Sequence, residues 1–267
     1  MAAITSPSNP KIKLIRKLRE RKERETSGLF YAEGLRILAE AVQQKASFEY
    51  LVVAPELLTS PFGQELLGNP GLAGTPVYEV SPDTFKSFAV KEGPQGIAAV
   101  LHQRWLSLES VHPQPGDSWV VLDEVADPGN LGTILRTHDA VGGKGVLLLD
   151  HTTDPYDPTS VRASMGSVFS QHLVKASFSA FTGWKKASQV PLIGASGAAS
   201  QDYHLFRFPD PYLLLMGSER EGLKEHHRQL CDNIISIPMV GRSDSLNLAI
   251  ATAVILYECY NQRRDRK

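Results

Sequence analysis

A short string of polar residues carries the first sign of chemistry in this chain. It contains Asn130, Gly132 and Arg136, placed just after the turn residues Asp127, Pro128 and Gly129. Gly132 and Arg136 are four residues apart, so they share one face of a helix that begins at this turn. An arginine close to a helix N-terminus, above a position without a side chain, makes a phosphate-binding arrangement. The alternative is a plain capped helix, with Asn130 as the cap and Arg136 paired with a neighbouring carboxylate such as that of Asp139.

Two further strings place glycines, a carboxylate and an amide after apolar runs. Gly217 ends one such run, and Glu219 and Gly222 follow it, so that the backbone at Gly217 can approach a flat ligand closely. A strand-to-helix turn needs no ligand to explain such glycines. The third string joins residues 237–239 to residues 245–247. Ser245 is expected to cap the last helix, whereas an asparagine in the first turn, Asn247, is a poor helix former and needs another explanation.

Other common chemistries have little support in the sequence. No dinucleotide-binding glycine pattern follows a strand, and the nucleophile elbow and the phosphate-binding P-loop are both missing. His226 and His227 are adjacent, so they do not share a helix face as a metal-chelating pair would, and we expect both on the surface. His138 and His204 are isolated in the sequence. We therefore expect neither a hydrolase nor a metal site.

The elements that must position these strings form two regions. The first hundred residues alternate predicted helices (33–44 and 56–67) with predicted strands (50–54, 77–80 and 96–102), which indicates a small α/β domain over residues 1–105. Residues 106–117 are rich in turn formers and are the predicted linker. From 118 to 267, short apolar runs at 119–123, 145–150, 191–195, 212–216 and 234–237 predict an open parallel sheet, with a final helix over 246–264. Ligands bind beyond the carboxyl ends of such strands.

Composition excludes several classes of protein. Of the 267 residues, 42% are hydrophobic and 21% are charged, which is typical of a globular chain and not of a disordered one. The longest apolar stretch, 248–257, is about half of the ~20 residues that span a bilayer. The N-terminus lacks the layout of a signal peptide, and two cysteines cannot form a disulfide framework. We expect a cytoplasmic protein without a membrane segment.

Positive charge is concentrated near the N-terminus. The net charge of the chain is -1, yet residues 11–24 hold eight basic and two acidic residues, a local charge of +6. Asn9 and Pro10 are suited to begin a helix there, and Ile12, Ile15 and Leu18 form its apolar stripe. Taken alone, this segment fits a solvated surface helix and an electrostatic contact with nucleic acid equally well.

Taken together and in order, the three strings resemble the motifs of the SpoU-type RNA ribose methyltransferases of the SPOUT class. The first is similar to that family's Asn-x-Gly-x-x-x-Arg-Thr motif, the second to Gly-Ser-Glu-x-x-Gly-Leu, and the third to Ile-Pro-Met followed by Ser-Leu-Asn. Residues 162–166 look like its middle segment. Near the N-terminus, residues 4–6, 9–11 and 30–34 resemble the substrate-binding domain of the ribosomal RNA members.

The resemblance implies a fold, a cofactor and a set of site residues. It implies an α/β protein whose C-terminal parallel-sheet SPOUT fold contains a deep trefoil knot, preceded by a small α/β RNA-binding domain, and a homodimer that binds S-adenosylmethionine in the knot. The implied cofactor residues are Gly217, Ile237, Met239 and Leu246. The implied catalytic residues are Arg136, Asn130, Glu219, Ser245 and Asn247.

The implied activity is 2′-O-methylation of RNA, with 23S-type ribosomal RNA favoured over tRNA by the N-terminal domain. A catalytically silent RNA-binding assembly factor is the alternative from another class. The basic N-terminal helix would then contact RNA phosphates through Lys11, Lys13, Arg16, Lys17 and Arg21. Two departures from the family pattern, His138 and Arg220, are expected to bear on the substrate pocket.

Overall fold

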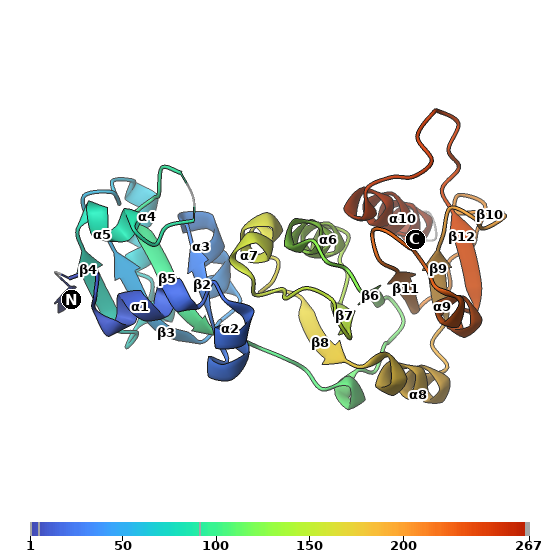
Figure 1. The fold of residues 1–267 in the computed structure, drawn as a ribbon, viewed down its shortest axis with the longest axis horizontal. Coiled ribbons are helices and arrows are strands. Elements are labelled where there is room, and N and C mark those ends of the chain that lie inside the picture. Colours follow the sequence, from blue (N-terminus) through green and yellow to red (C-terminus); the bar gives the residue numbers. More distant parts are fainter. Residues whose placement is uncertain (1, 5, 91, 265–267) are drawn as a thin grey trace. The chain divides into compact units, whose positions relative to one another are not determined.

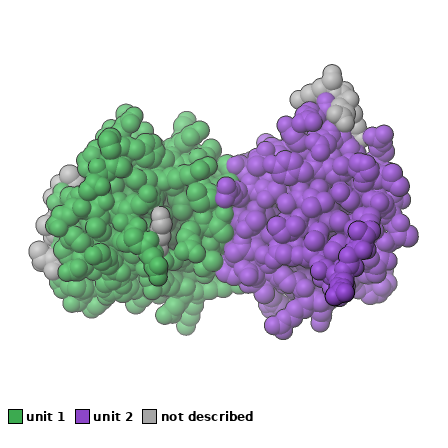
Figure 2. All heavy atoms as spheres, turned by 90° about the horizontal axis from the view of Figure 1, so that it is seen from above, with its two compact units in different colours: residues 1–103, 154–170 green, residues 104–153, 171–267 purple. Residues whose placement is uncertain are grey.

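In the computed structural model, residues 2–4, 6–90 and 92–264 are described. Thr5, part of the N-terminal family string, lies outside them, as do residues 265–267 of the predicted C-terminal domain. The chain forms two compact units, coloured separately in Figure 2. Unit 1 consists of Met1–Gln103 and Asp154–Ser170, and unit 2 of Arg104–Thr153 and Gln171–Lys267. Unit 1 is therefore assembled from two separate stretches of sequence.

Unit 1 is built on a mixed sheet. Among its described residues the strand order is β1-β4-β3-β5-β2, in which β1, β4 and β3 run parallel and β5 runs antiparallel to both β3 and β2 (Figure 1). The predicted strand over 77–80 is confirmed by β4. The bounds are β1 Ala2–Ile4, β2 Leu29–Glu33, β3 Phe48–Val53, β4 Val77–Val80 and β5 Ile97–His102.

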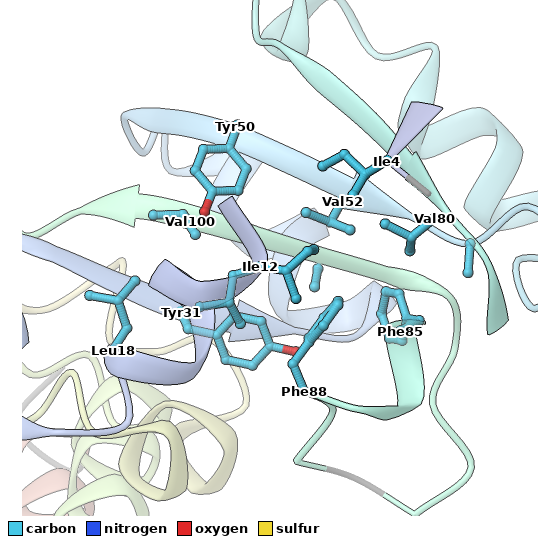
Figure 3. Packing of buried hydrophobic residues seen from close by; sticks show 13 residues of the cluster. Ile4, Ile12, Leu18, Tyr31, Tyr50, Val52, Val80, Phe85, Phe88 and Val100 are labelled. Carbon is cyan, nitrogen blue, oxygen red and sulfur yellow. The ribbon is translucent and has the colours of Figure 1, made fainter. Parts of the chain in front are cut away.

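Helices pack on this sheet through a narrow set of apolar side chains. Ile12, Ile15 and Leu18 are buried, as their helical spacing predicts, and they belong to a core cluster that includes Tyr31 and Phe88 (Figure 3). The helices of unit 1 are α1 Pro10–Lys17, α2 Arg21–Ser27, α3 Leu35–Gln43, α4 Pro61–Leu67, α5 Pro82–Lys86 and α7 Pro158–Ser164, with a short 3₁₀ turn at Pro70–Leu72.

The basic N-terminal segment is two helices and not one. Asn9 caps α1 as predicted, accepting a hydrogen bond from the backbone of Lys11 at 2.9 Å, but the helix ends at Lys17. Arg24 is buried and explains the break, because its guanidinium donates to the carbonyl oxygens of Leu18 and Arg19, both at 2.9 Å. These carbonyls follow α1 and would otherwise lack partners.

Arg24 also holds the second stretch of unit 1 in place. Its Nε donates to Asp154 Oδ2 at 2.6 Å, and its Nη2 lies 3.2 Å from Asp157 Oδ2. Nearby, the ring of Phe30 packs 4.5 Å from the ring of Tyr156. A residue counted from sequence as part of the basic surface is therefore an internal ion-pair partner.

Unit 2 is built on a parallel sheet, as predicted. Its described strands follow the order β10-β12-β9-β11-β6-β7-β8. Every residue of β6, β7 and β11 is buried, which is typical of parallel strands covered on both faces. The bounds are β6 Ser118–Asp123, β7 Gly145–Leu149, β8 His172–Ala176, β9 Leu192–Ala195, β10 Gln201–Asp202, β11 Tyr212–Met216 and β12 Asn233–Ser236.

The helices of unit 2 follow its strands. They are α6 Pro128–Ala140, α8 Phe178–Ser188, α9 Glu225–Leu230 and α10 Leu248–Arg264, with a 3₁₀ turn at Leu108–Ser110. Phe181 of α8 packs against the sheet in a cluster with Trp119 and Leu213, while α10 packs against α6. Within the described ranges, no helix has the length and apolar character needed to cross a bilayer.

Two predicted helix starts in unit 1 are wrong, and one strand of unit 2 is missing from the prediction. The helix expected over 33–44 begins at Leu35, because β2 occupies 29–33, and the helix expected over 56–67 begins at Pro61. The strand β8 was not predicted. It lies at the end of the described strand order, where β7 is its neighbouring strand and Leu106 adds a single bridge to Val174, and only Leu173 and Val174 of its five residues are buried. Two apolar residues are too few to give a strand signal.

Candidate active site

The loop after β6 is held by two carboxylates. Asp127 caps α6, since its Oδ1 accepts from the backbone N–H groups of Gly129 at 2.6 Å and Asn130 at 3.2 Å. The expectation that Asn130 caps this helix is therefore wrong. Asn130 is the third residue of α6, and its side chain is left for other contacts.

Glu219 ties the loop after β11 to the loop after β6. Its Oε2 accepts from Ala126 N at 3.1 Å, and its Oε1 accepts from Asp127 N and Asn130 Nδ2, both at 3.2 Å. Partial burial opposes the ionised form, but these hydrogen bonds from Ala126, Asn130 and Asp127 outweigh it and lower the pKa of Glu219. The carboxylate is thus ionised at neutral pH.

Asn247 extends this network to a third loop. Its Nδ2 donates to Asn130 Oδ1 at 3.0 Å, while its Oδ1 accepts from the backbone of Ala249 at 2.9 Å and Ile250 at 3.3 Å. Asn247 precedes α10 and caps it, so the expectation that Ser245 is the cap is wrong. The Ser245 hydroxyl Oγ instead donates a hydrogen bond to Asp244 Oδ1 at 3.3 Å. The chain Glu219–Asn130–Asn247 joins all three strings that the sequence singled out.

Arg136 lies on the next turns of α6 and is exposed. Six residues separate it from Asn130, about 9 Å along the helix axis. Within the described ranges its guanidinium has no hydrogen bond or ion pair, so the alternative in which it pairs with Asp139 is not observed. Gly132, one turn earlier, is buried. The arginine is therefore available to a ligand from outside the protein.

The two departures from the family pattern occupy different surroundings. His138 is fully buried, with Nδ1 2.8 Å from Gln171 Oε1 and Nε2 3.3 Å from Ser118 Oγ. Burial lowers its pKa to about 4. His138 is a core residue, and the expectation that it shapes the substrate pocket is wrong. Arg220 is exposed beside Glu219.

A pocket of about 130 Å³ collects most of the residues expected to bind a cofactor. Ile237, Met239 and Leu246 line it, together with Asp244 and Ser245. Gly217 is not among the lining residues, although the preceding Met216 is. A Cβ at Gly217 would collide with the carbonyl of Gly222, so the chain's own backbone requires a glycine there.

His227 was expected on the surface and is instead buried. Its Nε2 lies 2.5 Å from Asp123 Oδ2, and its Nδ1 accepts from the backbone of Lys224 at 2.9 Å. Because Nδ1 is an acceptor, Nε2 must carry the proton that it donates to Asp123. Nitrogen and oxygen atoms of Asp123, His226 and His227 lie within 4.8 Å of one another. Only the packing of α9 beside the end of β6 could reveal this cluster.

The predicted RNA-contacting residues divide into two groups. Lys13 and Lys17 are exposed, with no partner in the described part of the chain. Lys11 lies over the ring of Tyr50 at 4.6 Å, Arg16 donates to Ser87 Oγ at 2.7 Å, and Arg21 pairs with Glu25 at 3.1 Å. The freely available charge on α1 is therefore smaller than the sequence count.

Comparison with known proteins links both units to one class. A family described as the SpoU rRNA Methylase family matches residues 117–257, and the MRM3-like substrate binding domain matches residues 9–99. A 23S rRNA (uridine(2479)-2′-O)-methyltransferase of Streptomyces viridochromogenes is 34% identical over 92% of this chain and 87% of its own length. The 23S rRNA (guanosine(2553)-2′-O)-methyltransferase RlmP of Bacillus subtilis is 30% identical over 96% and 98%.

Solved structures agree with these relatives. An AdoMet-bound rRNA methyltransferase from Sinorhizobium meliloti superposes with a TM-score of 0.88 at 37% identity, covering 98% of this chain and 97% of its own. The SpoU methyltransferase AviRb from Streptomyces viridochromogenes, in complex with AdoMet, gives a TM-score of 0.88 at 31% identity over 96% and 98%. The matches extend over both units of the chain.

Proposed function

Because the chain belongs to the SpoU rRNA methylase family, we propose that it transfers a methyl group from S-adenosylmethionine to a ribose 2′-hydroxyl of 23S-type ribosomal RNA. The observation that carries this proposal is the hydrogen-bonded chain Glu219–Asn130–Asn247. It joins three loops beyond the strands of a parallel sheet, and residues preceding Asn247 line a pocket of cofactor type. An RNA-binding assembly factor without activity would have no need of this polar network.

The lining of the pocket suits part of S-adenosylmethionine, since its volume of about 130 Å³ is below the range of about 300–1,000 Å³ for sites that enclose a whole small ligand. Apolar walls from Ile237, Met239 and Leu246 can cover an adenine ring, and the Asp244 carboxylate supplies negative charge for a cationic ligand. When bound, the cofactor supplies an electrophilic methyl group on a positively charged sulfonium. Gly217 keeps the loop beside the pocket in shape through its close approach to Gly222.

The chain's own residues must orient the ribose and manage one proton. A guanidinium is not deprotonated in proteins, so Arg136 stays charged and acts as a hydrogen-bond donor and not as a base. It clamps an RNA phosphate beside the target ribose and stabilises negative charge that develops on the 2′-oxygen. Glu219 Oε2 accepts one hydrogen bond, from Ala126 N, and retains capacity for a second donor. We propose that this oxygen accepts a hydrogen bond from the 2′-hydroxyl and takes its proton as the methyl group is transferred, when the ribose oxygen becomes acidic.

Replacing Arg136 with alanine tests the proposal. Methyl transfer into 23S rRNA from radiolabelled cofactor should fall by about 10²- to 10³-fold, the usual loss for one charge-stabilising group. Calorimetric affinity for S-adenosylmethionine should stay the same, because Arg136 does not line the pocket. Lys186→Ala is the matched control, since Lys186 is exposed on α8 and loses the same charge. Full activity of Arg136→Ala would contradict the role given to Arg136. Transfer by the wild-type protein to tRNA in preference to rRNA would contradict the proposed substrate.

We further propose that the protein works as a homodimer through α10. Ile250, Tyr257 and Tyr260 are exposed on this helix at 50%, 48% and 38%, and their spacing of seven and three residues places them on one face. An exposed apolar stripe of this kind supports a protein contact. Sedimentation analysis of Tyr257→Asp, which should shift the protein to monomers, tests this.

We also propose a trefoil knot in unit 2 and a cytoplasmic location. The insertion of β12 between β9 and β10 agrees with the chain path of a trefoil knot. Cys231 and Cys259 are free thiols, and burial raises the pKa of each to about 12, which agrees with a location in the reducing cytoplasm.

A further inference from the structure

A second pocket, of about 320 Å³, lies within unit 1 and shares no lining residue with the cofactor pocket. Residues from the end of β2 and the start of α3 form one side, and residues of α7 form the other; α7 packs against β2. Its volume is at the lower end of the range for small-ligand sites, about 300–1,000 Å³. A single nucleotide is a ligand of suitable size.

Most of the lining is apolar. Ile37, Val161 and Met165 contribute to the walls, and Gly34 contributes a stretch without a side chain. Gly34 has a φ of 106° and lies close to Gln95, whose Oε1 accepts from the backbone of Leu35 at 3.1 Å. Apolar walls of this kind can enclose an unstacked base.

Two arginines line the same pocket. Arg36 and Arg162 are both exposed, and the described residues give neither of them a hydrogen bond or an ion pair. They come from the two separate stretches of sequence that make up unit 1. Two free guanidinium groups beside an apolar pocket suit a ligand with a phosphate attached to an apolar ring.

Glu33 adds a means of selecting between bases. Its Oε2 accepts from Tyr31 Oη at 2.9 Å and from Val90 N at 2.8 Å, so the carboxylate is held firmly. Its Oε1 is buried and has no hydrogen-bond partner in the described part of the chain. An unpaired buried acceptor is costly, and a donor from a pocket occupant would relieve that cost.

We propose that this pocket binds one unpaired nucleotide of the RNA substrate, with the phosphate at Arg36 and Arg162 and an N–H of the base on Glu33. The proposal rests on the proposed function only in taking RNA as the substrate. Guanine fits best, because its Watson–Crick edge carries adjacent N–H donors, whereas uracil flanks its single N–H with two carbonyl oxygens that would face the carboxylate. Unit 1 then reads a base, beyond the phosphate contacts expected of α1.

Methionine methyl groups allow the site to be observed directly. Of the four methionines in the chain, Met165 lines this pocket, whereas Met216 and Met239 line the cofactor pocket. The experiment is NMR of full-length protein that carries carbon-13 in its methionine methyl groups and is saturated with S-adenosylhomocysteine. Guanosine 5′-monophosphate should shift the methyl resonance of Met165 and leave those of Met216 and Met239 in place. Uridine 5′-monophosphate and inorganic phosphate should require several-fold higher concentrations for the same shift.

Three variants and a control separate the contributions. Arg36→Ala and Arg162→Ala should each weaken binding of guanosine 5′-monophosphate about tenfold and raise KM for rRNA similarly. Lys86→Ala, which removes an exposed charge of unit 1 outside the pocket, should change neither. Glu33→Gln should abolish the preference for guanosine over uridine monophosphate, because the amide can present a donor where the carboxylate presents an acceptor.

The outcomes distinguish this proposal from the proposed function. An unmoved Met165 signal at about 10 mM nucleotide, in protein that methylates rRNA normally, would overturn the pocket and leave the enzyme activity intact. Equal shifts by inorganic phosphate and by guanosine 5′-monophosphate would overturn the base-binding role. Wild-type protein that shifts Met165 but methylates no RNA would instead contradict the proposed function.

Discussion

His138 offers a test of the structure that can be worked out in numbers. The imidazole has no solvent exposure, and burial lowers its pKa to about 4 from an ordinary value of 6.5. Gln171 donates from its Nε2 to Gly143 O at 3.1 Å, so Gln171 Oε1 is the acceptor for His138 Nδ1–H, and the other imidazole nitrogen, His138 Nε2, lies 3.3 Å from Ser118 Oγ. Burial favours the neutral ring and outweighs the hydrogen-bonding contacts with Gln171 and Ser118, which raise the pKa.

The sign of the pH dependence follows from that preference. Between pH 6.5 and 4 the unfolded chain binds a proton at His138 that the folded chain does not, so stability must fall as the pH falls through this window. From pH 7 to pH 5 the two pKa values give a loss of about 2 kcal/mol in the free energy of unfolding. Below pH 4 this contribution levels off.

Urea unfolding followed by tryptophan fluorescence measures the loss of unfolding free energy in unit 2, where His138 lies. All three tryptophans, Trp105, Trp119 and Trp184, belong to unit 2, which also contains His138. Wild type should lose about 2 kcal/mol more than His138→Asn between pH 7 and pH 5, and His138→Gln provides a second non-titrating control. Equal losses in wild type and both variants would show that His138 protonates freely in the folded protein, which would refute the buried assignment.

Three other perturbations test separate features. Asn130→Ala and Asn247→Ala should act non-additively on kcat/KM, with a coupling of about 0.5–3 kcal/mol in a double-mutant cycle; additive effects would mean that the hydrogen-bonded chain to Glu219 is not a functional unit. Arg24→Ala should lower the free energy of unfolding by about 3–5 kcal/mol in circular-dichroism melts, because it leaves Asp154 as a buried charge without its partner; a change under 1 kcal/mol would argue against the ion pair. Replacing the two exposed lysines of α1, Lys13 and Lys17, with alanine should reduce the slope of the logarithm of RNA affinity against the logarithm of salt concentration by about 1.4–1.8. An unchanged slope would exclude this helix from the RNA interface.

Sequence reasoning succeeded where the signal was local. The five-residue run at 212–216 is apolar throughout, and it coincides with β11. Asn9 and Pro10 begin a helix because capping and a fixed φ act within a few residues. The polar strings were found for the same reason, since each one directly follows a recognisable strand.

Sequence reasoning fails where a segment distant in the chain supplies the hydrogen-bond or ion-pair partner of a residue. Arg24 was counted with the surface charges, because nothing near it in the sequence shows that Asp154 lies 130 residues away against its guanidinium. His227 was placed on the surface for the same reason, as its partner Asp123 lies 104 residues earlier. The cap of α10 was assigned to Ser245 and not to Asn247, because the start of the helix depends on a contact with Asn130.

The two-stretch composition of unit 1 limits how this protein can be divided. A fragment ending at Gln103 would leave Arg24 without the carboxylates of the later stretch and would uncover the ring of Phe30. Residues 1–103 therefore do not form an independent domain that can be cut at the linker and fused to another catalytic domain. Transplanting their specificity would require moving residues 154–170 with them, and chimeras that ignore this should fail to fold before their RNA preference can be measured.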